Sequence, residues 1–161
     1  FDSKEDLFQQ VVRWKHDDAY DELETRLAAQ QATPDRLRTI VRGTFAFCAR
    51  DPRVPQLMFQ TTYGPVLSTL SPFLQSIAER RFGIVEQVME AGLRAKELHG
   101  GGSRALALLF CSIMDYHAQT LSRLPDPDRT LTPALADALV DAFLSGVMPG
   151  RRKTPQLPAT L

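Results

Sequence analysis

The side chains best suited to catalysis lie close together in the second half of the chain. Cys111, Asp115 and His117 share one segment with helical periodicity. A nucleophilic cysteine needs a histidine within hydrogen-bond reach to take its proton. Cys111 and Asp115 share a helical face at i, i+4, whereas His117 lies about 120° away from Cys111 around the same helix, so no Cys/His dyad forms locally. This spacing argues against a catalytic centre in the segment.

Other signatures of catalysis and metal binding are missing from the sequence. No HExxH, ExxH, Walker or GxSxG pattern occurs, and the stretch HGGGS at 99–103 has no accompanying nucleophile elbow, so it predicts a helix end. The two cysteines, Cys48 and Cys111, lie far apart without CxxC spacing, which indicates neither a disulfide framework nor a zinc site. We predict that the chain is not an enzyme and uses no metal or cofactor. A helical enzyme is the least favoured alternative.

Arg81 lies in the middle of an apolar stripe over residues 70–88. A buried guanidinium needs a partner, either a carboxylate of the protein or a polar group of a ligand. Two interpretations stay open: a structural one, in which Arg81 forms an internal ion pair or extends to solvent, and a functional one, in which it anchors an acidic ligand head. His117, on the apolar face of its own segment, poses the same choice between a satisfied core or interface histidine and a ligand contact.

Composition limits the class of protein. A chain of 161 residues that is 43% hydrophobic is long enough for one domain with a substantial core. Lys plus Arg and Asp plus Glu balance at 19 each, which removes the simplest signature of a surface that coats nucleic acid. No apolar run approaches the roughly 18 residues of a membrane span, and no signal segment is present. Together with the spacing of the cysteines, these features predict a soluble cytoplasmic protein without a membrane partner.

Hydrophobic periodicity is helical nearly everywhere, which predicts an all-α fold. Ser3, Thr33 and Thr132 are the expected N-caps, with Pro34 and Pro133 at the first helical positions after the last two. The resulting bundle has about six helices, followed by a flexible tail over 149–161. The helices are expected over residues 4–30, 34–50, 56–63, 71–98, 103–124 and 133–148.

The first expected helix has a second apolar face that is limited to its first three turns. Leu7, Val11 and Trp14 form this face, which turns polar from Asp18 onward. A helix that is apolar on two sides at one end only must be packed on both sides there. We expect a further element to cover this face, although a loop of the same domain would also do so.

The last two long helices are apolar over more of their circumference than one core face requires. We expect the excess to pair with a second copy in a four-helix, two-fold interface, with small residues allowing close approach. The alternative is that both helices lie at the centre of a monomeric core. The expected interface residues are Leu106, Leu109, Ile113, Leu121, Leu135, Leu139, Ala142, Phe143 and Gly146.

The opening residues carry a family resemblance. Phe1-x-Ser3-Lys4-Glu5-x-Leu7 resembles the segment that leads out of the DNA-binding module of tetracycline-repressor-like (TetR family) bacterial transcription factors. Residues 1–8 carry the resemblance and would be the remnant of the junction with a missing N-terminal helix-turn-helix domain. Residues 9–148 match in helical organisation only, and would form the ligand-binding and dimerisation domain.

The resemblance implies a function. The full-length protein would be a ligand-responsive repressor that binds operator DNA through the missing domain, with Lys4 approaching the DNA phosphates. The last two helices would form the homodimer, and a small molecule would release the DNA by favouring one of two conformations. A partner-binding helical bundle without DNA function is the other alternative.

A ligand pocket is expected between the second, third, fourth and fifth helices. It would accept a mainly apolar molecule with one acidic or polar head. Most of its aromatic members are also consistent with ordinary core packing. The expected lining residues are Phe45, Phe59, Tyr63, Phe73, Ile77, Arg81, Phe110, Met114 and His117.

Overall fold

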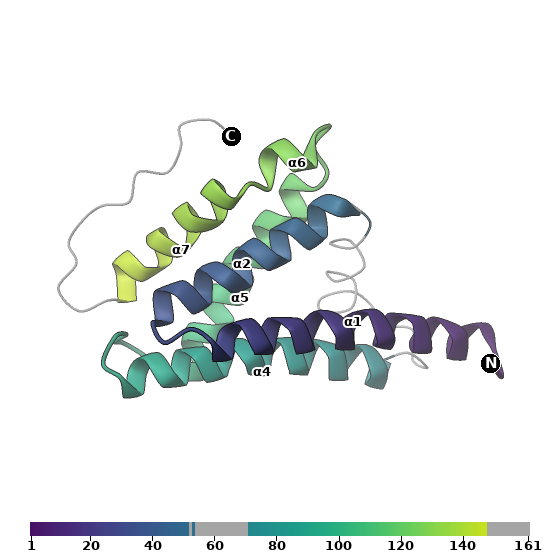
Figure 1. Ribbon diagram of the computed structural model, residues 1–161, viewed down its shortest axis with the longest axis horizontal. Helices are drawn as coiled ribbons and strands as arrows, with labels where there is room; N and C mark the ends of the chain where they lie inside the picture. Colours follow the sequence, from purple (N-terminus) through teal and green to yellow (C-terminus); the bar gives the residue numbers. More distant parts are fainter. Residues whose placement is uncertain (52, 54–70, 148–161) are drawn as a thin grey trace.

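Every regular element that the structure describes is a helix (Figure 1). The computed structural model describes residues 1–51, 53 and 71–147, and the predicted all-α fold is confirmed over them. The short helix expected over 56–63 and the tail at 149–161 lie outside the described residues. The helices are α1 (Lys4–Ala28), α2 (Thr33–Arg50), α4 (Ser71–Arg94), α5 (Ser103–Leu121), α6 (Pro127–Thr130) and α7 (Pro133–Val147).

The helices pack as two neighbouring pairs with α5 behind them. In Figure 1, α1 runs alongside α4, α2 runs alongside α7, and the first turns of α1 project past the start of α4. Helix α5 packs on α4 and on α2, and the rings of Phe110 in α5 and Phe143 in α7 meet edge-on with centroids 5.0 Å apart. The helices α1, α2, α4, α5 and α7 therefore all contribute to one core. Its largest fully buried side chains are Phe45, Phe110, Leu37, Met89, Met114, Leu144, Val41, Val85, Val140 and Cys48.

Two of the three predicted N-caps are confirmed. The hydroxyl of Ser3 accepts a hydrogen bond from the Asp6 N–H at 3.0 Å, and the hydroxyl of Thr132 accepts one from the Leu135 N–H at 3.2 Å. Each hydroxyl satisfies one of the helix N–H groups that have no partner within the helix. These caps fix the starts of α1 and α7.

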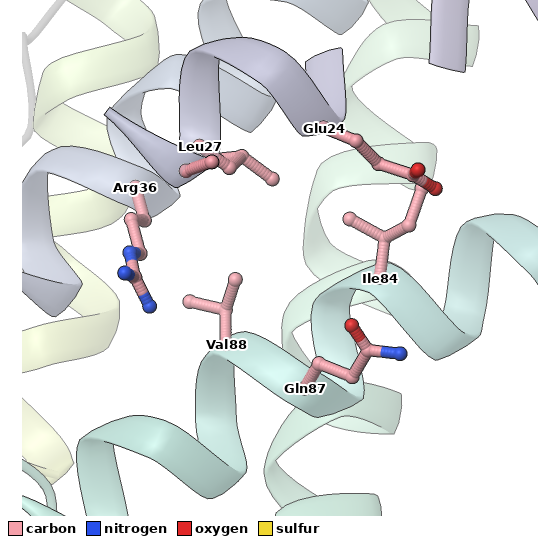
Figure 2. Close-up of a pocket in the computed structure, with 7 residues that line it drawn as sticks. Glu24, Leu27, Arg36, Ile84, Gln87 and Val88 are labelled. Atoms are coloured by element: carbon pink, nitrogen blue, oxygen red, sulfur yellow. The ribbon is translucent and has the colours of Figure 1, made fainter. Parts of the chain in front are cut away.

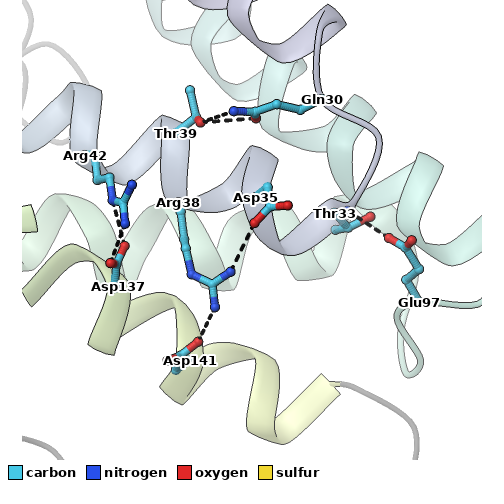
Figure 3. A network of polar contacts seen from close by, with 9 residues as sticks. All are labelled: Gln30, Thr33, Asp35, Arg38, Thr39, Arg42, Glu97, Asp137 and Asp141. Carbon is cyan, nitrogen blue, oxygen red and sulfur yellow. Dashed lines mark hydrogen bonds and ion pairs between the residues drawn. The ribbon is translucent and has the colours of Figure 1, made fainter. Parts of the chain in front are cut away.

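The predicted cap at Thr33 is wrong. Ala32 is the N-cap of α2, and Thr33 is already the first helical residue, where it is buried. Its backbone N–H instead donates to the Glu97 carboxylate at 2.8 Å, from the loop that follows α4 (Figure 3). The negative charge of Glu97 at the positive end of α2 also favours the pairing. A carboxylate distant in sequence therefore takes the place of a local cap.

Helix α4 ends at Arg94, four residues before the end expected from sequence. The chain turns away because Lys96 adopts a left-handed backbone conformation, with φ of 59°, and the N–H groups of Glu97 and Leu98 both donate to the Gly92 carbonyl. Gly92 has no room for a side chain, since a Cβ there would lie 2.7 Å from the Thr33 hydroxyl. The turn after α4, which is closed by hydrogen bonds to the Gly92 carbonyl, thus brings Glu97 to the start of α2.

Two arginine–carboxylate pairs join α2 to α7. Figure 3 shows Arg38 next to Asp141 and Arg42 next to Asp137. A terminal nitrogen of Arg38 donates to the Asp141 carboxylate at 2.7 Å, and the Nε of Arg42 donates to the Asp137 carboxylate at 2.8 Å. Because these pairs are partly exposed, solvent screens them and their contribution to stability is small. Their main effect is orientation, because they direct the polar edge of α7 toward α2 of the same chain.

Candidate functional site

A buried ion pair lies between α4 and α5. The guanidinium of Arg81 donates two hydrogen bonds to the two carboxylate oxygens of Asp115, at 2.6 and 2.7 Å. Each side chain is only 13% exposed. Such a planar, two-bond contact is the strongest form of arginine–carboxylate pairing. Arg81 therefore forms an internal ion pair with Asp115, as the structural interpretation of its position expects.

Helices α1 and α2 add polar side chains around this pair. We call His16 and Tyr20 of α1, Cys48 of α2, Arg81 of α4, and Cys111 and Asp115 of α5 the polar cluster. The rings of His16 and Tyr20 lie 5.6 Å apart, and the charges of Arg81 and Asp115 act on Tyr20 and on both thiols. Four helices of the bundle thus meet at one charged pair.

Burial dominates the electrostatics of the polar cluster. It raises the pKa of Tyr20, Cys48 and Cys111 to about 12 each, so all three are protonated at neutral pH. It lowers the pKa of His16 below the ordinary 6.5, because the protonated ring is poorly solvated and lies near Arg81. For Arg81, burial disfavours the charged form, but the Asp115 carboxylate outweighs it and the pKa is raised.

These states define what the polar cluster can do. Neutral thiols are poor nucleophiles, so neither cysteine is activated for covalent catalysis. No buried side-chain nitrogen or oxygen in the described part of the chain lacks a hydrogen-bond partner. The cluster is therefore complete without a ligand, and an acidic ligand would reach Arg81 only by displacing Asp115.

The other described residues expected to line a ligand pocket occupy two different environments. Phe45, Phe110 and Met114 are fully buried in the core, and Phe73 is nearly so. Ile77 is half-buried against the core, and His117 is half-buried with its Nδ1 donating to the Ile113 carbonyl at 2.8 Å. Phe59 and Tyr63 lie outside the described residues. Phe45, Phe110 and Met114 thus belong to one core cluster, and Ile77 packs against it.

An open pocket lies elsewhere, where α1, α2 and α4 meet (Figure 2). It has a volume of about 280 Å³ and combines an apolar floor with charged residues. Sequence reasoning missed it, because no single helix carries the pattern. Its lining residues are Glu24, Leu27, Ala28, Arg36, Ile84, Gln87 and Val88.

The residues expected at a dimer interface divide into buried and accessible groups. Leu106, Leu121, Leu139 and Phe143 lie in the core of the chain itself, because α5 packs on α4 and α7 packs on α2. Leu109 is 50% exposed, Gly146 is exposed, and Ile113, Leu135 and Ala142 are partly exposed.

Two apolar side chains of α5 that sequence reasoning missed are also exposed. Leu108 is 55% and Tyr116 is 65% exposed. The run Leu108-Leu109 was the available signal, since one core-facing stripe cannot accommodate both neighbours. Leu108, Leu109, Ile113 and Tyr116 together form what we call the α5 face.

The second apolar face expected near the start of α1 is exposed. Phe1, Leu7 and Val11 are 79, 41 and 48% exposed, and Trp14 is also largely accessible. Lys4 is exposed at the first position of α1, directly after the Ser3 cap. Exposed apolar groups thus gather on the end of α1 that projects from the bundle.

Comparisons with known proteins place no further constraint on the site. No family model, no curated protein and no solved structure matches the chain. Among the described residues, no three His, Cys, Asp or Glu side chains are arranged to hold a metal ion. No described helix has an apolar stretch long enough to cross a bilayer.

Proposed function

We propose that this chain is the regulatory domain of a ligand-responsive, DNA-binding transcriptional regulator of the TetR type, a repressor released by a small molecule. The observation that carries the proposal is the projecting end of α1. There the motif residues Ser3 and Lys4 adjoin the exposed side chains of Phe1, Leu7 and Val11. Contiguous exposed apolar groups mark a surface that another element covers. A helix-turn-helix domain seated on α1 would cover them.

The α5 face supports pairing of two copies. Leu108, Leu109 and Tyr116 are each at least half exposed on one helix, although the same helix also contributes Phe110 and Met114 to the core. Exposed aromatic and leucine side chains in one patch are typical of protein–protein interfaces. Two copies joined through this face would hold two DNA-binding domains at a fixed spacing, as two half-sites on DNA require.

The polar cluster offers a means of sensing. An acidic ligand head that takes Arg81 away from Asp115 would leave a buried carboxylate unpaired and would shift α4 relative to α5. Since His16 and Tyr20 of α1 lie beside the pair, α1 would move as well. If the ligand and DNA favour different arrangements, the factor by which the ligand lowers DNA affinity equals the factor by which DNA lowers ligand affinity.

DNA binding is tested in two steps. The residues encoded before Phe1 are read first, and we expect a helix-turn-helix there. The full-length protein is then titrated with DNA from the region flanking its gene at several salt concentrations. Lys4→Gln should weaken binding to all sequences and lower the salt slope by about one, as loss of one phosphate contact does. Lys96→Gln, at an exposed position in the turn after α4, is the matched control and should change nothing.

Two results would overturn the proposal of a regulator. One is a full-length sequence without a DNA-binding module before Phe1. The other is a full-length protein that binds this DNA no better than unrelated DNA at physiological salt. In either case the exposed end of α1 would belong to a partner-binding bundle.

Pairing is tested on the chain itself by analytical ultracentrifugation. We expect a dimer that Leu109→Glu converts to a monomer with unchanged helical circular dichroism. Leu7→Glu makes the same charge change on a leucine of α1 that is 41% exposed, and it should leave the dimer intact. A wild-type chain that sediments as a monomer at tens of micromolar would contradict pairing through the α5 face.

A further inference from the structure

The pocket between α1, α2 and α4 has a continuous apolar floor. Figure 2 shows Leu27 of α1 facing Ile84 and Val88 of α4 across the opening. These three side chains are themselves largely buried, so the floor belongs to the packed core and keeps its shape. A volume of about 280 Å³ lies close to the lower end of the range of about 300–1,000 Å³ that small-molecule pockets occupy. It therefore suits a small molecule with a short hydrocarbon body.

One end of the pocket carries Arg36, for which the described residues supply no carboxylate partner. The Nε of Arg36 donates to the Gln30 carbonyl at 2.8 Å, which holds the side chain in place. Within the described part of the chain, no carboxylate forms an ion pair with Arg36. Glu97 is near enough to be affected by its charge but bonds to Thr33. The terminal nitrogens of Arg36 remain as donors, in the planar geometry that matches a carboxylate.

The opposite end carries excess negative charge. Figure 2 places Glu24 and Gln87 across the pocket from Arg36. Arg80 forms an ion pair with Glu24, but it bonds more closely to Asp17 and Asp21, at 2.9 and 2.7 Å, than to Glu24 at 3.4 Å. Three carboxylates thus share one guanidinium. Glu24 is the least tightly held of them and half exposed.

We propose that this pocket binds a small ω-amino carboxylate. The carboxylate pairs with Arg36, the methylene chain covers Leu27, Ile84 and Val88, and the ammonium group lies toward Glu24. A dicarboxylate would meet repulsion at Glu24, and a diamine would meet it at Arg36. An uncharged chain would gain only the apolar floor. The arrangement of charge at the two ends therefore selects the ligand class and its direction in the pocket.

The binding site is independent of the proposed role in transcription. Only an effect of the ligand on DNA affinity would rest on that role, because α1 leads to the surface proposed to carry the DNA-binding domain. The experiment therefore measures binding to the chain alone, by isothermal titration calorimetry and by chemical-shift changes. A negative result here would leave the DNA experiment unaffected, and the reverse also holds.

The probes are γ-aminobutyrate and ε-aminocaproate, with caproate and hexylamine as controls that each lack one charged end. We expect saturable binding of at least one ω-amino carboxylate, with each control about tenfold weaker, since one charge-assisted hydrogen bond accounts for about that factor. Arg36→Gln should abolish the preference over hexylamine, and Arg36→Lys should restore part of it. Glu24→Gln should abolish the preference over caproate.

The matched control variant is Glu22→Gln, on the same helix but paired with Arg26 outside the pocket. It should bind the probes as the unaltered chain does, and circular dichroism checks that every variant is folded. No saturable binding of either ω-amino carboxylate would overturn the proposal. Equal binding of both to the unaltered chain, Arg36→Gln and Glu24→Gln would overturn it too.

Discussion

Removing one member of the buried ion pair should destabilise the chain severely. Asp115→Ala leaves the Arg81 guanidinium charged and without its carboxylate, at a site where both side chains are 13% exposed. Breaking a buried pair in this way costs about 3–5 kcal/mol. For a domain of this size, each kcal/mol lowers the melting temperature by about 2–4 °C. We therefore expect a decrease of roughly 6–20 °C.

The assay is thermal unfolding, with urea unfolding for the free energy, both followed by circular dichroism at one fixed protein concentration, since pairing of copies makes stability depend on concentration. Glu90→Ala is the matched control, because it removes an exposed carboxylate from an arginine of the same helix, Arg94. Its cost should be about 0.3–0.5 kcal/mol. The double variant Arg81→Met with Asp115→Leu should recover most of the loss, because it removes both charges and retains the volume.

Two outcomes would refute this reasoning. If Asp115→Ala costs no more than Glu90→Ala, the guanidinium of Arg81 reaches solvent in the folded chain and the pair is not buried in solution. If the double variant is as unstable as Asp115→Ala, the loss comes from packing around the side chains and not from an unpaired charge.

Three further predictions concern the junction of α2 with α4 and the histidine of α1. Gly92→Ala should cost about 1–3 kcal/mol because its Cβ would lie 2.7 Å from the Thr33 hydroxyl. Gly83→Ala, in the same helix with nothing within 4 Å, should stabilise by about 0.5–1 kcal/mol in the same urea assay. Glu97→Ala should cost about 1 kcal/mol through loss of the acceptor for the Thr33 N–H, and Glu97→Gln should cost less. Burial lowers the pKa of His16 below its unfolded value of 6.5, so the unfolded chain binds the proton more tightly, and stability should fall as pH drops from 6.5 toward the lower folded pKa. His16→Gln should flatten that part of a stability curve measured by urea unfolding, whereas an unchanged curve would contradict the assignment.

Features that depend on neighbouring residues were predictable from sequence. The caps at Ser3 and Thr132 need only a hydroxyl and the next turn of backbone, so the residue type and position sufficed. The prediction at Thr33 used the same local features and is wrong because more distant residues decide the outcome there. Its role is set by the backbone of Ala32 and by Glu97, which only the turn after α4 brings close.

Features that depend on which helices pack together were not predictable. The position of Arg81 showed that it needed a partner, but the choice of Asp115 required α4 to lie against α5. The width of an apolar face in the sequence likewise does not show whether that face packs against the same chain or against another copy. The packing of α7 on α2 buries Leu139 and Phe143, whereas α5 leaves Leu109 exposed.

The pocket with Arg36 and Glu24 at its ends was beyond sequence analysis for the same reason. Its lining comes from α1, α2 and α4, and no one of them carries a recognisable pattern. The sequence of α2 contains four arginines, and nothing in it singles out Arg36. Only the absence of a carboxylate partner within the described structure distinguishes it from Arg38 and Arg42, which pair with α7.

Two consecutive arginines connect α4 to its neighbours in mechanically different ways. Arg81 has a single carboxylate on α5, so any axial slip between those helices breaks the pair. Arg80 faces Asp17, Asp21 and Glu24, which recur about once per turn along α1. A slip of α1 by one turn, about 5.4 Å, would return a carboxylate to Arg80. The ion pairing between α1 and α4 is thus compatible with more than one relative position of the two helices, whereas the pairing between α4 and α5 is compatible with one.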